Sequence, residues 1–110
     1  MDSSTQADLA QAIGRLWARH FPEIMARVAI LEAAAETFAA GALDLHQRED
    51  AASAAHKLAG VLGSFGLARG TTLARELEIL YSLENGPSPE SASRLAPIAA
   101  ELRMLVENRE

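Results

Sequence analysis

Hydrophobic residues recur at steps of three and four along most of the chain, which is the spacing that places them on one face of an α-helix. The clearest stripes are Ile24, Val28, Leu31, Ala35 and Phe38; Ala51, Ala55, Leu58, Leu62 and Phe65; and Leu95, Ile98, Leu102 and Leu105. Valine, isoleucine and threonine never alternate with polar residues over a run, so no strand is expected. The pattern predicts five helices, over about residues 5–20, 22–40, 49–65, 68–84 and 88–108.

Glycine and proline mark the boundaries of these helices. Gly41 and Gly66 each follow a stripe, at positions where a left-handed residue commonly stops a helix. Pro22 and Pro89 are expected in the first turn of a helix, where the missing N–H does no harm. Pro97 falls inside the last pattern and should kink that helix or split it in two.

The helix lengths and short connectors predict an all-α fold. Four of the segments fit an antiparallel up-down four-helix bundle, and the segment over 5–20 would flank it as a short additional N-terminal helix. A polar connector over residues 44–48 precedes the third helix, which is expected to begin near Glu49. At 110 residues the chain is expected to be a single domain over 1–110, and a monomer.

Composition supports this fold and removes several classes of function. The 23 alanines favour helices, and 49% hydrophobic residues are enough for one core. The chain has no cysteine for disulfides or thiolate metal sites, and its net charge of −5 without a basic cluster argues against nucleic-acid binding. No apolar run is long enough for a membrane span, and residues 1–4 lack the features of a signal peptide. A cytoplasmic location is therefore expected.

The third predicted helix has an outer face that differs from an ordinary solvated one. With the apolar stripe at zero, His56 points about 140° away and should lie in solvent. Its neighbours on that face are all small: Ala52, Ala59, Gly60 and Gly63. Two glycines inside a helix cost about 0.5–1 kcal/mol each relative to alanine, which requires an explanation. They permit either close packing of another helix or the approach of another protein's active site to His56.

Other candidate residues carry weaker signals. Lys57 is the only lysine in the chain and could neutralise a phosphoryl group on His56, or be an ordinary surface residue. His20 is expected at the edge of the core and His46 in a solvated loop, and the three histidines lack the spacing of a metal site. The acidic residues expected to form a solvated face are Glu76, Glu78 and Glu84.

From His56 to Leu67 the sequence reads HKLAGVLGSFGL, which resembles the histidine-containing phosphotransfer (HPt) domain. The pattern of that family is roughly H-x-L-K-G-x-x-x-x-[LF]-G-[AL], followed by a leucine and a Leu-Glu pair in the next helix. Here the later positions are Leu73 and Leu77-Glu78. The resemblance in helix number and length extends over nearly the whole chain, and the Ala and Arg content suits a bacterial protein.

The resemblance implies a phosphorelay intermediate rather than an autonomous kinase. His56 would accept a phosphoryl group from the aspartate of a receiver domain and pass it to another receiver, in a response regulator or a hybrid histidine kinase. The partner receiver would bring Mg²⁺, and this chain would need no cofactor of its own. Gly60 and Gly63 would give access, and Ala52, Ala59 and Ser64 would form the docking rim.

One departure from the family concerns Ala59, where the family often has lysine. Lys57 could substitute in part, the receiver's own lysine and metal could suffice, or transfer could be weak or lost. The alternative function is therefore an HPt-like module that docks a receiver or sister signalling domain without phosphotransfer. A third is a bundle that self-associates through Gly60 and Gly63.

Overall fold

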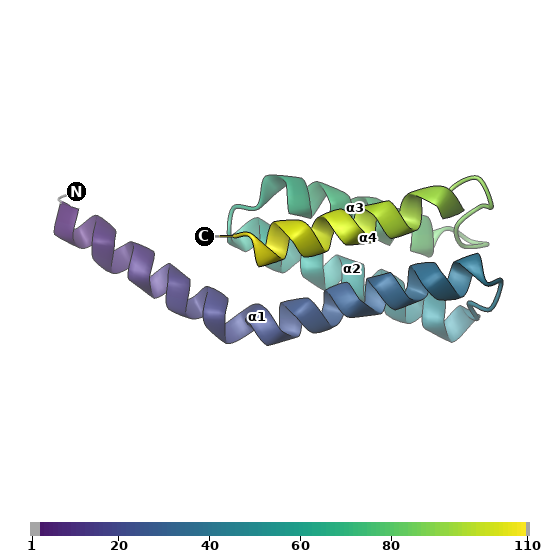
Figure 1. The fold of residues 1–110 in the computed structure, drawn as a ribbon, viewed down its shortest axis with the longest axis horizontal. Helices are drawn as coiled ribbons and strands as arrows, with labels where there is room; N and C mark the ends of the chain where they lie inside the picture. The colour runs from purple at the N-terminus through teal and green to yellow at the C-terminus, as the bar shows by residue number, and fades with distance from the viewer. Residues whose placement is uncertain (1–2, 110) are drawn as a thin grey trace.

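The computed structural model describes residues 3–109 and shows four helices, with no strand within that range. They are α1 (Ser3–Ala39), α2 (Leu45–Ser64), α3 (Ala68–Ser82) and α4 (Ala92–Glu107). α1 and α3 each contact both α2 and α4, so the helices form a ring around a shared core, and the chain turns back at each loop (Figure 1). The all-helical prediction is confirmed. Residues 1 and 2, part of the segment expected to lack signal-peptide features, and residue 110 lie outside the described residues.

Most residues of the predicted apolar stripes lie in the core, and Phe38, Phe65 and Leu105 are partly buried against it. Leu58, Leu62 and Leu102 have no exposed surface, and no polar or charged residue among those described is buried with them, apart from the hydroxyl of Tyr81. Burial of leucine-sized side chains contributes about 1.5–3 kcal/mol each and is the main force that holds the helices together. No helix within residues 3–109 has the length and apolar character needed to cross a bilayer.

The prediction of two separate helices over 5–20 and 22–40 is wrong, because α1 runs without interruption through Pro22. Proline removes one backbone hydrogen bond, to the carbonyl of Ala18, and bends a helix without necessarily ending it. Both residues lie on the exposed side of α1, where water can hydrate that carbonyl. The expected additional helix is therefore the first part of α1, which bends and extends past the bundle (Figure 1).

The glycine stops of α1 and α2 are confirmed. Gly41 and Gly66 have φ of 71° and 75°, a left-handed conformation that costs glycine little. At the end of α2 the Gly66 N–H donates to the Gly63 carbonyl (3.1 Å) and the Leu67 N–H to the Leu62 carbonyl (2.9 Å). This pair of bonds is a Schellman motif, and it satisfies carbonyls that the helix end would leave free.

Two predicted helix starts are wrong. α2 begins at Leu45 instead of Glu49, because Asp44 and Gln47 form a capping box: the Gln47 N–H donates to Asp44 Oδ1 (2.8 Å) and the Asp44 N–H to Gln47 Oε1 (3.0 Å). α4 begins at Ala92, since residues 88–91 form turns before it. Pro97 lies on the exposed side of α4 and does not split that helix.

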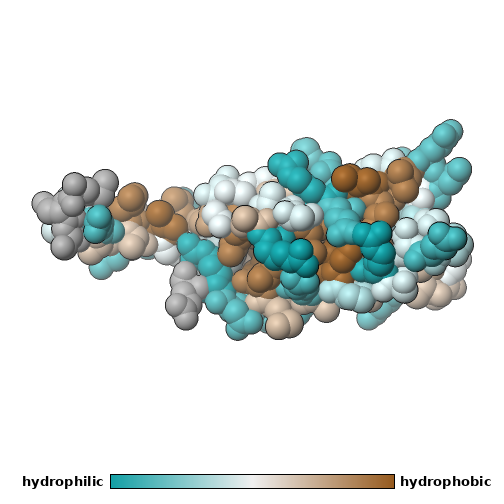
Figure 2. Space-filling view, turned by 90° about the horizontal axis from the view of Figure 1, so that it is seen from above, coloured by the Kyte–Doolittle hydropathy of each residue, from teal (hydrophilic) through white to brown (hydrophobic). Residues whose placement is uncertain are grey.

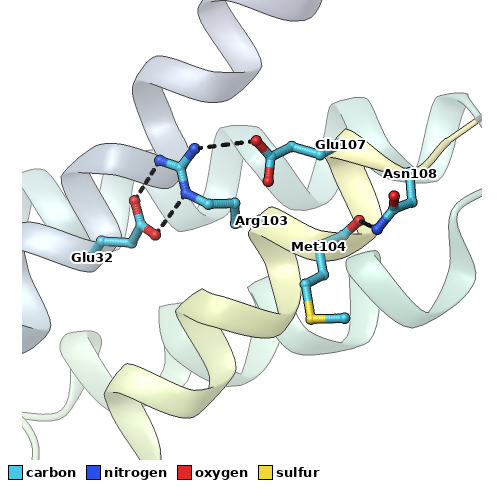
Figure 3. A network of polar contacts seen from close by, with 5 residues as sticks. All are labelled: Glu32, Arg103, Met104, Glu107 and Asn108. Carbon is cyan, nitrogen blue, oxygen red and sulfur yellow. Dashed lines mark hydrogen bonds and ion pairs between the residues drawn. The ribbon is translucent and has the colours of Figure 1, made fainter.

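An ion pair joins α1 to α4 across the surface of the bundle (Figure 3). Arg103 Nε and Nη2 donate to the two carboxylate oxygens of Glu32 at 2.7 and 2.6 Å, and Glu107 lies 3.7 Å from Nη1 of the same guanidinium. The hydrogen bonds from Arg103 hold the pKa of Glu32 below its ordinary value. The pair therefore favours the folded state when Glu32 is ionised.

We expect Glu32→Gln to lower the free energy of unfolding at pH 7, and the loss to disappear as the pH falls. The pKa of Glu32 is lower in the folded than in the unfolded chain. Its contribution is complete above the unfolded pKa and is lost as the pH falls through the folded pKa. Urea unfolding from pH 7 to pH 3 measures this, with Glu36→Gln on an exposed site of α1 as control. A difference between wild type and Glu32→Gln that does not change with pH would contradict the expectation.

Candidate functional site

His56 lies in the middle of α2 and is open to solvent. Its side chain is 73% exposed, whereas Ala55 and Leu58 on the opposite side of the helix are fully buried. This confirms the exposure predicted from the helical spacing. A solvent-exposed imidazole in a rigid helix can be reached by another protein without any rearrangement of the bundle.

The imidazole of His56 is held by a carboxylate from the neighbouring helix α3. His56 Nδ1 lies 2.7 Å from Glu78 Oε2, and the Glu78 side chain is 29% exposed. A carboxylate has only acceptor atoms, so the hydrogen of this bond belongs to Nδ1. In the neutral ring the lone pair is then on Nε2, which is the nitrogen available as a nucleophile. Glu78 fixes both the tautomer and the orientation of the ring.

The role of Glu78 was not predicted, since it was expected on a solvated face with Glu76 and Glu84. Glu76 instead pairs with Arg94 of α4, and only Glu84 is fully exposed. Two signals for Glu78 were present in the sequence: it directly follows the buried Leu77 at the edge of an apolar stripe, and Leu77-Glu78 matches the Leu-Glu pair of the family pattern. Nothing in the local spacing connects residue 78 with residue 56, because that contact depends on how α3 lies against α2.

The surface beside His56 is bare where the two glycines lie. A Cβ atom placed on Gly60 would meet no atom within 4 Å, and one on Gly63 would meet Thr71 Oγ1 at 3.5 Å, an ordinary contact. Packing within the described residues therefore does not require glycine at either position. Of the two explanations for these glycines, space for another molecule fits Gly60 better than packing against a helix of the same chain.

The small residues expected on the outer face of α2 do not all lie there. Ala59 is only 2% exposed and belongs to the core, and Ala52 is partly buried against it. The expectation is wrong for Ala59 because Ala55 and Leu62, its neighbours one turn away on either side, are buried on the same side of α2. Ser64 is exposed, and its hydroxyl donates to the Gly60 carbonyl at 3.1 Å.

Lys57 and His56 face different neighbours. His56 contacts α3, whereas Lys57 lines a shallow hollow between α1 and α2 together with Arg27, Ile30 and Asp50. Successive residues of a helix differ by about 100° in direction, so adjacent positions do not share a face. The structure does not bring the Lys57 ammonium together with the His56–Glu78 pair.

An apolar surface leads from the C-terminal part of α2 to the projecting part of α1. Ile13, Leu16 and His20 line a hollow with Val61, Ser64 and Phe65. Leu9, Ile13 and Leu16 share one face of the first part of α1 and are 52%, 37% and 46% exposed, so this face is not packed on the bundle. Figure 2 shows apolar residues on this projecting part.

His20 is partly buried at this surface, with its ring 6.5 Å from the Phe65 ring, which confirms the expected edge position. His46 lies in the first turn of α2 instead of a loop, 3.5 Å from Asp50. Within residues 3–109 no three His, Asp or Glu side chains are grouped as metal ligands would be.

We expect Gly60→Ala to raise the free energy of unfolding by about 0.5–1 kcal/mol, because alanine is the better helix former and its Cβ meets open space. Gly66→Ala is the matched control and should be destabilising, since Gly66 has a φ of 75°. Denaturant unfolding followed by circular dichroism measures both. A destabilised Gly60→Ala variant would show that the surface is occupied in the folded chain.

We expect nitrogen-15 NMR of neutral His56 to show hydrogen on Nδ1 and the lone pair on Nε2. In Glu78→Ala the population with hydrogen on Nε2 should rise, because the acceptor for Nδ1–H is gone. Glu78→Gln keeps a carbonyl acceptor and should retain more of the wild-type tautomer. Glu36→Ala controls for the loss of one negative charge. An unchanged tautomer in Glu78→Ala would contradict the assignment.

Comparison with known proteins agrees with this geometry. The family model described as Hpt domain matches residues 15–109. Among curated proteins the chain is similar to Protein RcaC of Microchaete diplosiphon, with 26% identity over 106 residues that cover 96% of this chain and 16% of RcaC. The chain thus spans only a small part of that relative, and no solved structure matches it significantly. Because the family model spans most of the chain, including His56 and Glu78, the chain belongs to the Hpt domain family.

Proposed function

We propose that this chain is a phosphorelay intermediate. His56 accepts a phosphoryl group from the aspartate of one receiver domain, and the phosphoryl group then passes to the aspartate of a second receiver domain. The Hpt family places the chain in phosphorelay signalling. The observation that supports the finer assignment is the exposed His56 ring, with Nδ1 bound to Glu78 and Nε2 without a partner among the described residues. This is the arrangement that a phosphoryl acceptor needs.

The proposed transfer is an exchange of one bond for another. The Nε2 lone pair attacks the phosphorus of the acyl phosphate, the bond between phosphorus and the aspartate oxygen breaks, and the aspartate leaves as a carboxylate. The hydrogen stays on Nδ1, where Glu78 balances the positive charge that the phosphorylated ring gains. Transfer to the second receiver reverses these steps. Catalysis then depends mainly on positioning and on neutralising charge.

The proposed docking surface surrounds His56 and follows the apolar hollow toward α1. Gly60 and Gly63 leave room for the rim of a receiver active site, and Ala52 and Ser64 lie at the edges. The receiver would supply Mg²⁺ and its own acidic residues, so this chain would need no cofactor or kinase activity of its own. We propose that it acts as a monomer. The cytoplasm, where such receivers act, is the proposed location.

The test is transfer from a labelled phospho-receiver. We expect wild type to gain an acid-labile label and His56→Gln to gain none, because the amide has no nucleophilic ring nitrogen. His46→Gln, which removes an exposed histidine from the same helix, should label like wild type. A His56→Gln variant that labels as well as wild type would contradict the proposal.

The second candidate is a docking module without phosphotransfer. The observation that favours it is the absence of a charged side chain at position 59, where Ala59 is buried. A receiver that binds wild type and His56→Ala equally well, and that never transfers a phosphoryl group to either, would support this candidate over the first.

A further inference from the structure

Two contacts determine how α3 lies beside the exposed face of α2. His56 meets Glu78, and Gly63 lies next to Thr71, so residue numbers rise along α2 as they fall along α3. Thr71 and Glu78 are seven residues apart, which is two helical turns, and therefore share one face of α3. This face borders the bare surface of α2.

Arg75 lies between these two contacts on the same face of α3. It is four residues after Thr71 and three before Glu78, the two separations that place side chains next to each other on a helix. In the alignment described above, Arg75 comes level with Ala59 and Gly60, about one helical turn, or 5.4 Å along the axis, from the level of His56. An arginine side chain is long enough to span that distance.

The guanidinium of Arg75 is free. It is exposed and makes no hydrogen bond or ion pair with any residue in the range 3–109, although it lies one turn from the Glu78 carboxylate. The other arginines of α3 and α4 are all engaged: Arg69 with Glu101, Arg94 with Glu76, and Arg103 with Glu32. Glu78 instead binds His56, which leaves Arg75 without a partner among residues 3–109, at the helical level of Gly60 in the alignment above.

We propose that Arg75 binds the phosphoryl oxygens once His56 is phosphorylated, and so acts as the phosphate-positioning cation of this domain. The inference rests on the proposed phosphotransfer function. A phosphoryl group on Nε2 brings nearly two negative charges to a surface that already carries the Glu78 carboxylate. Lys57 faces α1, and Ala59 is buried and uncharged. A planar guanidinium that donates two parallel hydrogen bonds matches phosphoryl oxygens well.

The test uses phosphoramidate, which phosphorylates histidine without a receiver, followed by phosphorus-31 NMR titration of the phosphohistidine. We expect the phosphoryl group to lose its last proton at a higher pH in Arg75→Ala than in wild type, because a bound cation favours the dianion. Arg75→Lys should restore part of the difference. Lys57→Ala removes the rival cation and should titrate like wild type, as should Arg19→Ala, which removes another exposed arginine.

A second measurement uses the phospho-receiver. Transfer to Arg75→Ala should be slower by about tenfold or more, because the variant loses the charge-assisted hydrogen bonds of the guanidinium. The role of Arg75 is overturned if wild type is phosphorylated but Arg75→Ala matches it in both the titration and the transfer rate. It is also overturned if Lys57→Ala, rather than Arg75→Ala, shifts the titration and slows the transfer. If wild type gains no phosphoryl group from either donor, the proposed function itself fails, and this inference with it. Circular dichroism confirms that each variant is folded.

Discussion

The packing of α3 against α2 is the constraint on which the rest of the site depends. The two helices meet through the buried leucines of both, and Gly70 of α3 approaches Leu62 of α2 so closely that a Cβ would lie 2.9 Å from its Cδ1. Because interiors are close-packed, such a contact allows little sliding of one helix along the other. A shift by one residue would separate Glu78 from His56. The orientation of the imidazole is therefore a consequence of core packing.

The reactive histidine and the ion pairs that connect helices lie on different parts of the bundle. The ion pairs that connect helices, such as Glu32 with Arg103 and Arg69 with Glu101, are on or near the surfaces between α4 and its neighbours. At the edge between α2 and α3, His56 and Glu78 form a pair, and Arg75 has no partner among residues 3–109. A free cation and a nucleophile can face the same incoming group there without first breaking an ion pair.

The projecting part of α1 is a second consequence of backbone chemistry. Pro22 removes a hydrogen bond on the solvent side of the helix, while Ile24 and Val28 on the inner side remain in the core. Among residues 4–21, which precede Pro22 and whose burial is described, only Trp17 is buried, against Phe65 and under the Arg109 guanidinium. The exposed Ile13 and Leu16 thus continue the apolar surface of α2 toward the N-terminus.

The amino-acid pattern by itself determined the helical class, the core stripes, the glycine stops and the exposure of His56. These features depend on the spacing of nearby residues and on the backbone preferences of glycine, and they need no contact between residues distant in sequence. The capping box is also local, since Asp44 and Gln47 are three residues apart in the segment that the sequence predicts as a connector. The effect of Pro22 was not determined by the sequence, since proline ends some helices and only bends others. Burial of the residues on the inner side of α1 is what keeps this helix continuous.

The contact of His56 with Glu78 was decided by the tertiary structure. Glu78 and Arg75 are about twenty residues from His56 in sequence, and only the alignment of α3 with α2 brings them to its edge. The same alignment buried Ala59 and turned Lys57 toward α1, because adjacent positions on a helix face different neighbours. Helical periodicity determines which side of its own helix a residue occupies. Which residue of another helix it meets depends on the packing of the core.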